Sequence, residues 1–226
     1  MFKRLIVALT LICCAGAAAA QDKWIEGKHY FRLAQTQPTS TPGRIEVLDV
    51  FSYACPACNA FQPTLDKLQA ALPPEAQMAY LPAAFNPSED WPVFQRAFLA
   101  ARELGVSEKS HDAMYQAVWG KSGSLPITDK LTGRLLPQSA QPTIETVAGF
   151  YTAYGVKEQD FLAMARSFTV DAKIRQAEAQ MLADQVDSTP TLIVNGKYRV
   201  TPSAAGGYAQ TIELVQYLVA REKGGK

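Results

Sequence analysis

The stretch VLDVFSYACPAC, residues 47–58, places two cysteines directly after an apolar run, and this arrangement decides the fold. The longer segment RIEVLDVFSY, residues 44–53, is rich in Val, Ile, Phe and Tyr. Such a run predicts a buried central strand, in which Asp49 is the odd member among mostly apolar residues.

The residues after the strand, 55–72, predict an amphipathic helix that begins at the cysteine motif. Pro56 suits the first turn of a helix, because its missing N–H would have no partner there. Pro63 should kink the helix. Apolar side chains recur at spacings of four and three residues, at Phe61, Leu65, Leu68 and Leu72.

The C-x-x-C spacing has a specific chemical meaning at the start of a helix. Residues three apart lie on one face, so the sulfurs of Cys55 and Cys58 can meet. Cys55 lies among the free N–H groups of the helix start, which favour a thiolate. Cys58 lies one turn deeper. We therefore expect Cys55 to bond to a partner protein, and Cys58 to resolve that bond or form the resting bridge.

Two structural alternatives compete with a redox pair. A structural zinc site needs two further ligands, and apart from Cys13 and Cys14 the chain offers only His29 and His111, which are far apart in sequence. We expect both histidines to be solvated or capping residues. An inert bracing disulfide is possible, but closing so small a loop removes little entropy from the unfolded chain. Redox chemistry is favoured.

Length and composition point to one globular domain with a large insertion. The chain has 226 residues, of which 48% are hydrophobic and 19% are charged, so it can bury a core. The formal net charge is +1, with no basic stripe or charged tail. We therefore expect no nucleic-acid partner.

The first 20 residues predict a secretory signal peptide. MFKR supplies the positive start, LIVALTLICCAG the apolar centre and AAAA the cleavage site, with cleavage after Ala20. An uncleaved anchor is the alternative, although the apolar run is short for a bilayer. A lipid on Cys13 or Cys14 is disfavoured by Ile12. Cleavage would leave one cysteine pair in an exported, oxidising compartment.

The remaining sequence predicts an α/β fold with a block of helices in the middle. Aromatic residues of that block are expected in its core: Phe94, Phe98, Tyr151 and Tyr154. The other expected elements are a short strand at 29–34, a strand at 78–85, helices within 87–185 around a loop at 121–142, a hairpin at 191–200 with a two-residue Asn195-Gly196 turn, and a final helix at 211–222.

The chain resembles the thioredoxin superfamily, and within it the DsbA-like periplasmic thiol:disulfide interchange proteins. Residues 47–58 are similar to the strand-then-motif region of that family. Asp49 matches its buried acid, and Pro63 matches the helix-kinking proline of thioredoxin. STPTLIVNGKY, residues 188–198, resembles its cis-proline loop and hairpin, which makes Pro190 the expected cis residue.

The resemblance covers residues 23 to 223 and implies a thioredoxin fold, with a central mixed β-sheet and an inserted α-helical domain. The domain boundaries that follow are a cleaved signal peptide at 1–20, a thioredoxin-like domain at 21–86 and 186–226, and a helical domain at 87–185.

The resemblance also implies roles for residues around the cysteines. A cis Pro190 would bring the backbone of Thr189 beside them, where it can pair with an extended substrate, and the Thr189 hydroxyl could interact with Cys55. A buried Asp49 should have a raised pKa and could accept or relay the Cys58 proton. Well-known DsbA sites carry a histidine at the position of Ala57, so we expect a weaker oxidant here.

Three functions remain open at this point. The leading one is a dithiol oxidase that donates its disulfide to reduced or unfolded exported proteins, and is regenerated by a DsbB-like membrane oxidant. It would need no cofactor beyond the cysteine pair and would act as a monomer. A disulfide isomerase or reductase is the second function, although only residues 21–54 are available for a dimerisation domain before the motif. A chaperone-like binding module without redox turnover is the third.

Overall fold

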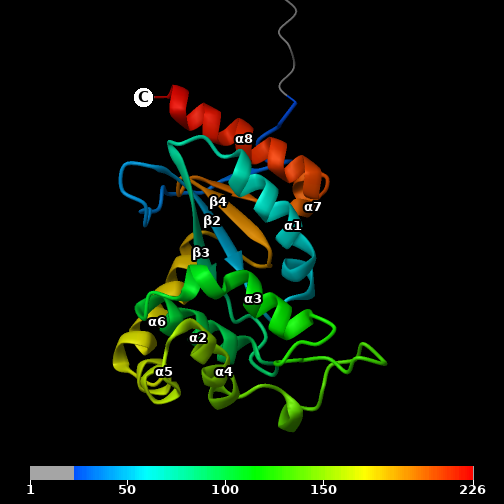
Figure 1. The fold of residues 1–226 in the computed structure, drawn as a ribbon. Helices are drawn as coiled ribbons and strands as arrows, with labels where there is room; N and C mark the ends of the chain where they lie inside the picture. The colour runs from blue at the N-terminus through cyan, green and yellow to red at the C-terminus, as the bar shows by residue number, and fades with distance from the viewer. Residues whose placement is uncertain (1–22, 226) are drawn as a thin grey trace, which may run out of the picture.

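The structure is a computed structural model that describes residues 23–225 (Figure 1). A five-stranded sheet, in the order β1-β5-β4-β2-β3, forms the centre of one half of the molecule. Strand β2 pairs in parallel with β3 and antiparallel with β4, so the sheet is mixed, as predicted. The strands are β1 (Phe31–Arg32), β2 (Ile45–Phe51), β3 (Ala76–Pro82), β4 (Thr191–Val194) and β5 (Tyr198–Val200).

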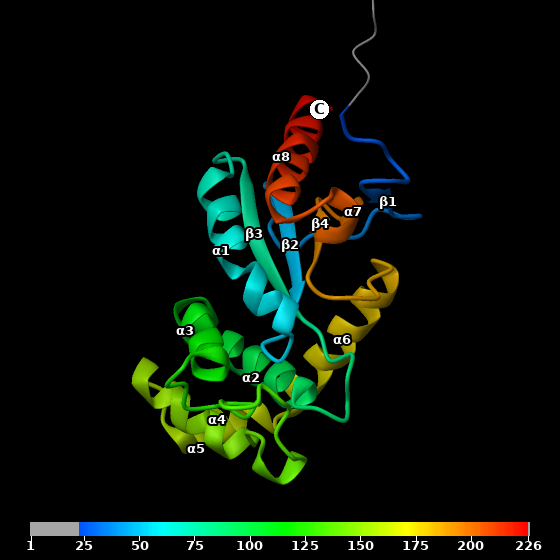
Figure 2. The same ribbon diagram turned by 90° about the vertical axis from the view of Figure 1, so that its right-hand side faces the viewer.

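Helices cover both faces of this sheet. The helices α1 (Pro56–Ala71) and α8 (Tyr208–Gly224) lie against one face, and α6 (Phe168–Ala183) lies on the other side (Figure 2). Leu65 and Leu68 of α1 pack in one cluster with Leu214 of α8. The same cluster includes Val47 of β2 and Val194 of β4. The cysteine motif therefore lies at the end of a helix that is fixed along its length by the core.

Strand β2 is buried at all seven of its positions. Because successive side chains of a strand point to opposite faces, Val47 packs with α1 and α8, whereas Leu48 and Val50 pack with α6. Coverage on both sides explains why the sequence of β2 is an almost unbroken apolar run. The predicted buried central strand is confirmed.

A helical block is inserted between β3 and β4. It consists of α2 (Trp91–Glu103), α3 (Ser107–Trp119), α4 (Ile144–Tyr151) and α5 (Glu158–Ala165), together with α6, and forms the lower half of the molecule in Figure 1. Thr143 caps α4 through a capping box with Thr146. The core expected from the aromatic residues is confirmed, because Phe94, Phe98 and Tyr151 are buried and Tyr154 packs partly buried against them.

The hairpin of β4 and β5, and the segment after it, differ from the prediction in two details. Asn195 and Gly196 adopt positive φ angles of 53° and 62°, as an Asn-Gly turn requires. The ladder resumes with Tyr198 opposite Val194, however, so the connection has three residues rather than the predicted two. The extra residue is Lys197, whose N–H donates to the Val194 carbonyl oxygen at 3.0 Å. A short helix, α7 (Pro202–Ala205), then precedes α8 and was not predicted.

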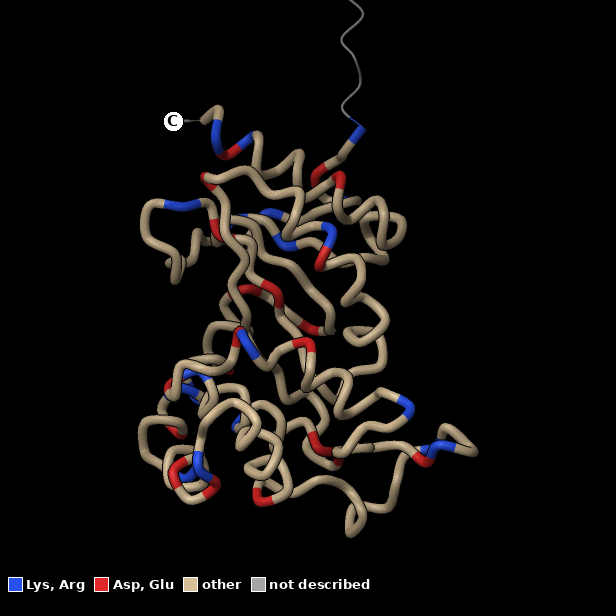
Figure 3. The backbone as a smooth tube through the Cα atoms, viewed as in Figure 1, with Lys and Arg blue, Asp and Glu red and all other residues tan. Residues whose placement is uncertain are grey.

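Charged residues of both signs are interspersed over both halves of the molecule (Figure 3). Within residues 23–225, none of the helices combines the length and the apolar character needed to cross a membrane. The predicted signal peptide, residues 1–20, lies outside the described part of the chain.

Candidate active site

Cys55 caps the N-terminus of α1, with Pro56 in the first helical turn. Its sulfur accepts a hydrogen bond from the backbone N–H of Cys58 at 3.3 Å. Both cysteines are buried and free in this structure. The predicted placement at a helix start is therefore confirmed, and the helix continues through Pro63 to Ala71.

The loop before β4 supplies the other wall of the site. The peptide bond between Thr189 and Pro190 is cis, as the resemblance implies. The Cys55 thiol donates to the carbonyl oxygen of Thr189, with 3.6 Å between sulfur and oxygen. The Thr189 hydroxyl oxygen is buried and makes no hydrogen bond to another described residue. The backbone carbonyl makes the hydrogen bond between this loop and Cys55, while the Thr189 side chain, as the sequence suggested, also contributes to lowering the Cys55 pKa.

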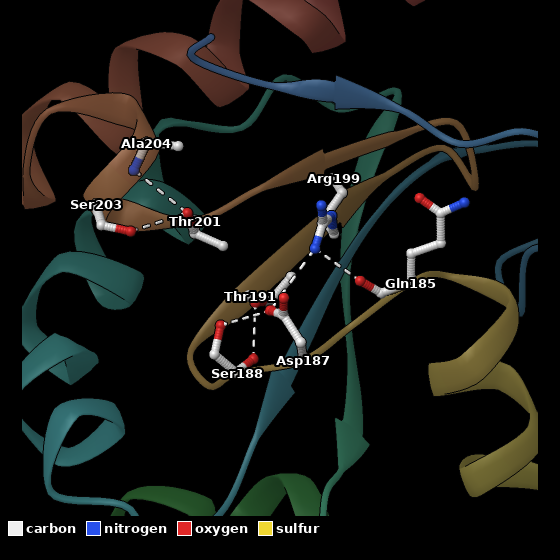
Figure 4. Close-up of polar contacts among 8 residues, drawn as sticks. All are labelled: Gln185, Asp187, Ser188, Thr191, Arg199, Thr201, Ser203 and Ala204. Carbon is white, nitrogen blue, oxygen red and sulfur yellow. Dashed lines mark hydrogen bonds and ion pairs between the residues drawn. The ribbon is translucent and has the colours of Figure 1, made fainter. Parts of the chain in front are cut away.

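Polar contacts hold this loop in place (Figure 4). The Arg199 guanidinium on β5 donates to the carbonyl oxygen of Gln185 at 2.7 Å and lies 3.7 Å from the carboxylate of Asp187. The Thr191 hydroxyl donates to the carbonyl oxygen of Ser188 at 2.8 Å. The segment that carries Thr189 and Pro190 is therefore attached at both of its ends to the sheet.

The two thiols have opposite electrostatic environments. The hydrogen bond from the Cys58 thiol, aided by the backbone N–H groups of Cys58 and Ala57 and opposed by burial, lowers the pKa of Cys55 to about 6. Burial raises the pKa of Cys58 well above its ordinary value, and the Cys55 sulfur and the Asp49 charge add to that increase. At neutral pH, Cys55 is the thiolate of the pair and Cys58 is the thiol.

Asp49 lies behind the cysteines, on the face of β2 that α1 covers. Its side chain is buried, and its Oδ1 atom has no hydrogen-bond partner among the described residues. Burial, with a smaller contribution from the Cys55 charge, raises the pKa of Asp49 to about 8. The carboxyl group is therefore mostly protonated at neutral pH. The predicted burial and raised pKa of Asp49 are confirmed.

Helix α3 supports the motif from the insertion, through contacts that the sequence analysis missed. Trp119 donates from its indole N–H to the carbonyl oxygen of Tyr53 at 2.8 Å. The Tyr53 hydroxyl lies 2.9 Å from Nδ1 of His111. His111 is buried among aromatic rings, and burial lowers its pKa to about 4, so our expectation of a solvated or capping residue was wrong. His29 accepts from the N–H of Ile25 at 3.0 Å within a turn that is not the end of a helix.

Tyr208, the first residue of α8, also reaches the motif and was missed from the sequence. Its hydroxyl donates to the carbonyl oxygen of Ala57 at 3.4 Å, and its ring packs edge-on against Phe61 with 5.1 Å between centroids. Gly206 and Gly207 precede it with φ angles of 96° and 131°. This glycine pair was the available signal, because consecutive positive φ angles turn the chain sharply.

The described residues also limit what else the site can contain. Within residues 23–225, no group of three or more His, Cys, Asp and Glu side chains is placed to hold a metal ion. The side chain of Ala57, which stands where well-known relatives carry histidine, is exposed on the solvent side of the motif.

Comparisons of the whole chain with known proteins point to one family. The family model described as thioredoxin matches residues 40–213. The thiol:disulfide interchange protein DsbA of Pseudomonas aeruginosa is 33% identical over 215 residues, which cover 95% of this chain and 93% of the relative. DsbA of Pseudomonas syringae pv. tomato is 32% identical over 224 residues, covering 98% of this chain and 96% of the relative.

Solved structures agree with the sequence relatives. The crystal structure of Pseudomonas aeruginosa DsbA matches with a TM-score of 0.73 at 33% identity, over 90% of this chain and 96% of that one. The oxidoreductase DsbA from Xylella fastidiosa matches with a TM-score of 0.75 at 32% identity, over 88% and 97%. The expected thioredoxin fold and the resemblance to DsbA-like proteins are confirmed. The chain belongs to the DsbA family of thiol:disulfide interchange proteins, and is a disulfide oxidoreductase that uses a cysteine pair and no bound cofactor.

Proposed function

We propose that this chain is a periplasmic dithiol oxidase in which Cys55 is the sulfur that exchanges with substrate. The observation that carries the proposal is the asymmetry of the pair, because the pKa of Cys55 is lowered to about 6 while that of Cys58 is raised. A thiol of low pKa is the better leaving group in disulfide exchange. A mixed disulfide between Cys55 and a substrate is therefore resolved readily.

The reaction begins with the Cys55–Cys58 disulfide. A substrate thiolate attacks the Cys55 sulfur, the bond between the two cysteines breaks, and Cys58 leaves as a thiolate. Asp49, which is protonated at neutral pH, supplies the proton that neutralises Cys58. A second substrate thiolate then attacks the substrate sulfur of the mixed disulfide and releases Cys55 as a thiolate. Two electrons have passed from the substrate dithiol to the cysteine pair.

The cis-proline loop positions the substrate in this scheme. The Thr189 carbonyl oxygen already lies within hydrogen-bond distance of the Cys55 thiol. An extended chain that pairs with the backbone beside Pro190 would hold its cysteine next to Cys55. Unfolded or reduced exported proteins are the proposed substrates, because they present extended segments with free thiols.

Several finer assignments belong to the same proposal. The chain is exported by cleavage after Ala20, works as a monomer, and is reoxidised by a DsbB-like membrane oxidant. Its domains are divided at 21–86, 87–185 and 186–226. The division is supported by the end of β3 at Pro82 and by the contact between Arg199 and the segment at Gln185.

The test uses the mature protein with a reduced, unfolded substrate that holds one pair of cysteines. We expect the oxidised protein to form the substrate disulfide and Cys55→Ser to be inactive. We expect Cys58→Ser, after Cys55 has been oxidised with glutathione disulfide, to exchange the glutathione for a substrate thiol and form a mixed disulfide through Cys55. Retained activity in Cys55→Ser would refute the proposed role of that residue. A stable dimer that reshuffles wrong disulfides faster than it oxidises thiols would instead identify an isomerase.

A further inference from the structure

Tyr208 is placed beside the motif by a turn that only glycine accommodates well. Gly206 and Gly207 have φ angles of 96° and 131°, in the region that residues with a side chain rarely adopt. The chain therefore leaves α7 and begins α8 with Tyr208, whose hydroxyl reaches the carbonyl oxygen of Ala57 in the first turn of α1. Phe61 is buried and fixes the tyrosine ring by an edge-on contact, while 37% of Tyr208 remains exposed.

One peptide group joins the tyrosine to the reactive sulfur. The Tyr208 hydroxyl donates to the carbonyl oxygen of Ala57 at 3.4 Å. The N–H of the same peptide group belongs to Cys58, and it donates to the Cys55 sulfur at 3.3 Å. A donor at the carbonyl oxygen polarises the amide and makes its N–H a stronger donor, so hydrogen bonds arranged in series strengthen one another.

We propose that Tyr208 is a positioning residue for the disulfide exchange, an inference that rests on the proposed function. Its hydroxyl acts through the Ala57–Cys58 peptide group and strengthens the hydrogen bond from the Cys58 N–H to the Cys55 sulfur. That hydrogen bond stabilises negative charge on the sulfur. Tyr208 does not touch the sulfur. Its effect is greatest when Cys55 is released as a thiolate, because a hydrogen bond to a charged acceptor is stronger than one to a neutral acceptor. The hydroxyl thus favours the Cys55 thiolate, as a histidine at position 57 would, but it acts through a peptide group instead of a charged side chain.

Tyr208→Phe tests this by removing the hydroxyl and keeping the ring on Phe61. In the reduced variant, we expect the ratio of thiolate to thiol at Cys55 to fall about twofold at a given pH, followed by thiolate ultraviolet absorbance. The equilibrium of the Cys55–Cys58 pair against glutathione should shift by about the same factor, towards a less oxidising disulfide.

Tyr217→Phe is the matched control, because it makes the same change on the same helix. Tyr217 packs against the core cluster under α8 and has no hydrogen bond to the motif among the described residues. We expect this variant to keep the wild-type thiolate ratio and glutathione equilibrium. An equal change in both variants would mean that Tyr208 acts only through the stability of α8, which would overturn the inference.

A stronger hydrogen-bond donor at the same position should act in the opposite direction. Fluorinated tyrosine incorporated at position 208 has a more acidic hydroxyl, and we expect it to raise the thiolate ratio while the phenol remains protonated. This measurement also decides the question if Tyr208→Phe fails to fold. Wild-type ratios in both the Phe and the fluorinated protein would overturn the role of Tyr208, whereas full activity in Cys55→Ser would overturn the proposed function itself.

Discussion

Ala57 stands at the position where the resemblance to well-known DsbA sites leads us to expect a histidine. The backbone N–H groups of Ala57 and Cys58 contribute to the low pKa of Cys55, but the short side chain of Ala57 adds no charge. The thiolate is therefore stabilised by the Cys58 thiol and the helix start, without an imidazole.

Ala57→His should make the disulfide more oxidising. A protonated imidazole beside Cys55 stabilises its thiolate and so lowers its pKa, which favours the reduced form of the pair. We expect a shift of about tenfold in the equilibrium constant against glutathione. Ala60→His is the control, since it introduces the same side chain at an exposed position farther along α1. Similar shifts in both variants would indicate a general charge effect instead.

Asp49→Asn should change how stability depends on pH. The pKa of Asp49 is raised from 3.8 to about 8 in the folded protein, so its contribution is fully present below 3.8 and is lost as the pH rises through about 8. The variant has no such loss. From pH 5 to pH 8.5, we expect its free energy of unfolding to rise relative to that of the wild type by on the order of 4 kcal/mol. Denaturant titrations of both reduced proteins at several pH values measure these free energies of unfolding. The same pH dependence in the variant and the wild type would contradict the prediction.

Among the elements, the hairpin of β4 and β5 shows how a tight turn is held against the rest of the molecule. The N–H of Gln37 donates to the carbonyl oxygen of Gly196 at 2.8 Å. A Cβ atom on Gly196 would lie 2.1 Å from the Gln37 carbonyl oxygen, and its φ angle is 62°. Both the backbone angle and the close approach require glycine here.

Gly196→Ala should therefore be strongly destabilising, by about 3 kcal/mol, because backbone strain and a clash with backbone atoms add together. Gly133→Ala is the matched control, since Gly133 has a φ angle of 68° with nothing within 4 Å of an added Cβ. Its cost should be about 1 kcal/mol, from the backbone angle alone. Denaturant unfolding of the two variants gives the loss of free energy of unfolding in each. Equal losses would show that the close approach to Gln37 adds nothing to the cost of the backbone angle.

Elements with a strong local pattern could be predicted from the sequence, whereas contacts between elements could not. The apolar run of β2 and the spacing of Phe61, Leu65 and Leu68 on α1 are local patterns, and both predictions hold. The place of His111 depends on how α3 packs against the motif, and that of Tyr208 on the turn before α8. Neither packing leaves a periodic signal in the sequence.

At the scale of the whole molecule, the charge on Cys55 links the redox state to folding. The pKa of Cys55 falls from an ordinary value of 9.0 to about 6 in the folded dithiol protein. The thiolate therefore stabilises the reduced fold increasingly as the pH rises from about 6 towards 9, and this stabilisation is lost as the pH falls through 6.

Reduced wild type and Cys55→Ser should differ in the pH dependence of unfolding. Between pH 5.5 and pH 7, we expect the free energy of unfolding of the reduced wild type to gain about 1 kcal/mol relative to the variant. Denaturant unfolding under reducing conditions gives both values at each pH. Equal slopes for the two proteins would mean that Cys55 is not the group that titrates in this range.

The contact between Cys55 and Thr189 joins residues that are 134 positions apart, with the whole helical block between them. Bringing two such distant residues together closes a long loop of chain, and the entropy cost of that closure makes the contact slow to form during folding. The two cysteines are only three residues apart, so a newly made chain holds them near each other before Thr189 has reached them. We therefore expect the disulfide exchange of this pair to appear only once the helical block has folded and brought Thr189 to Cys55.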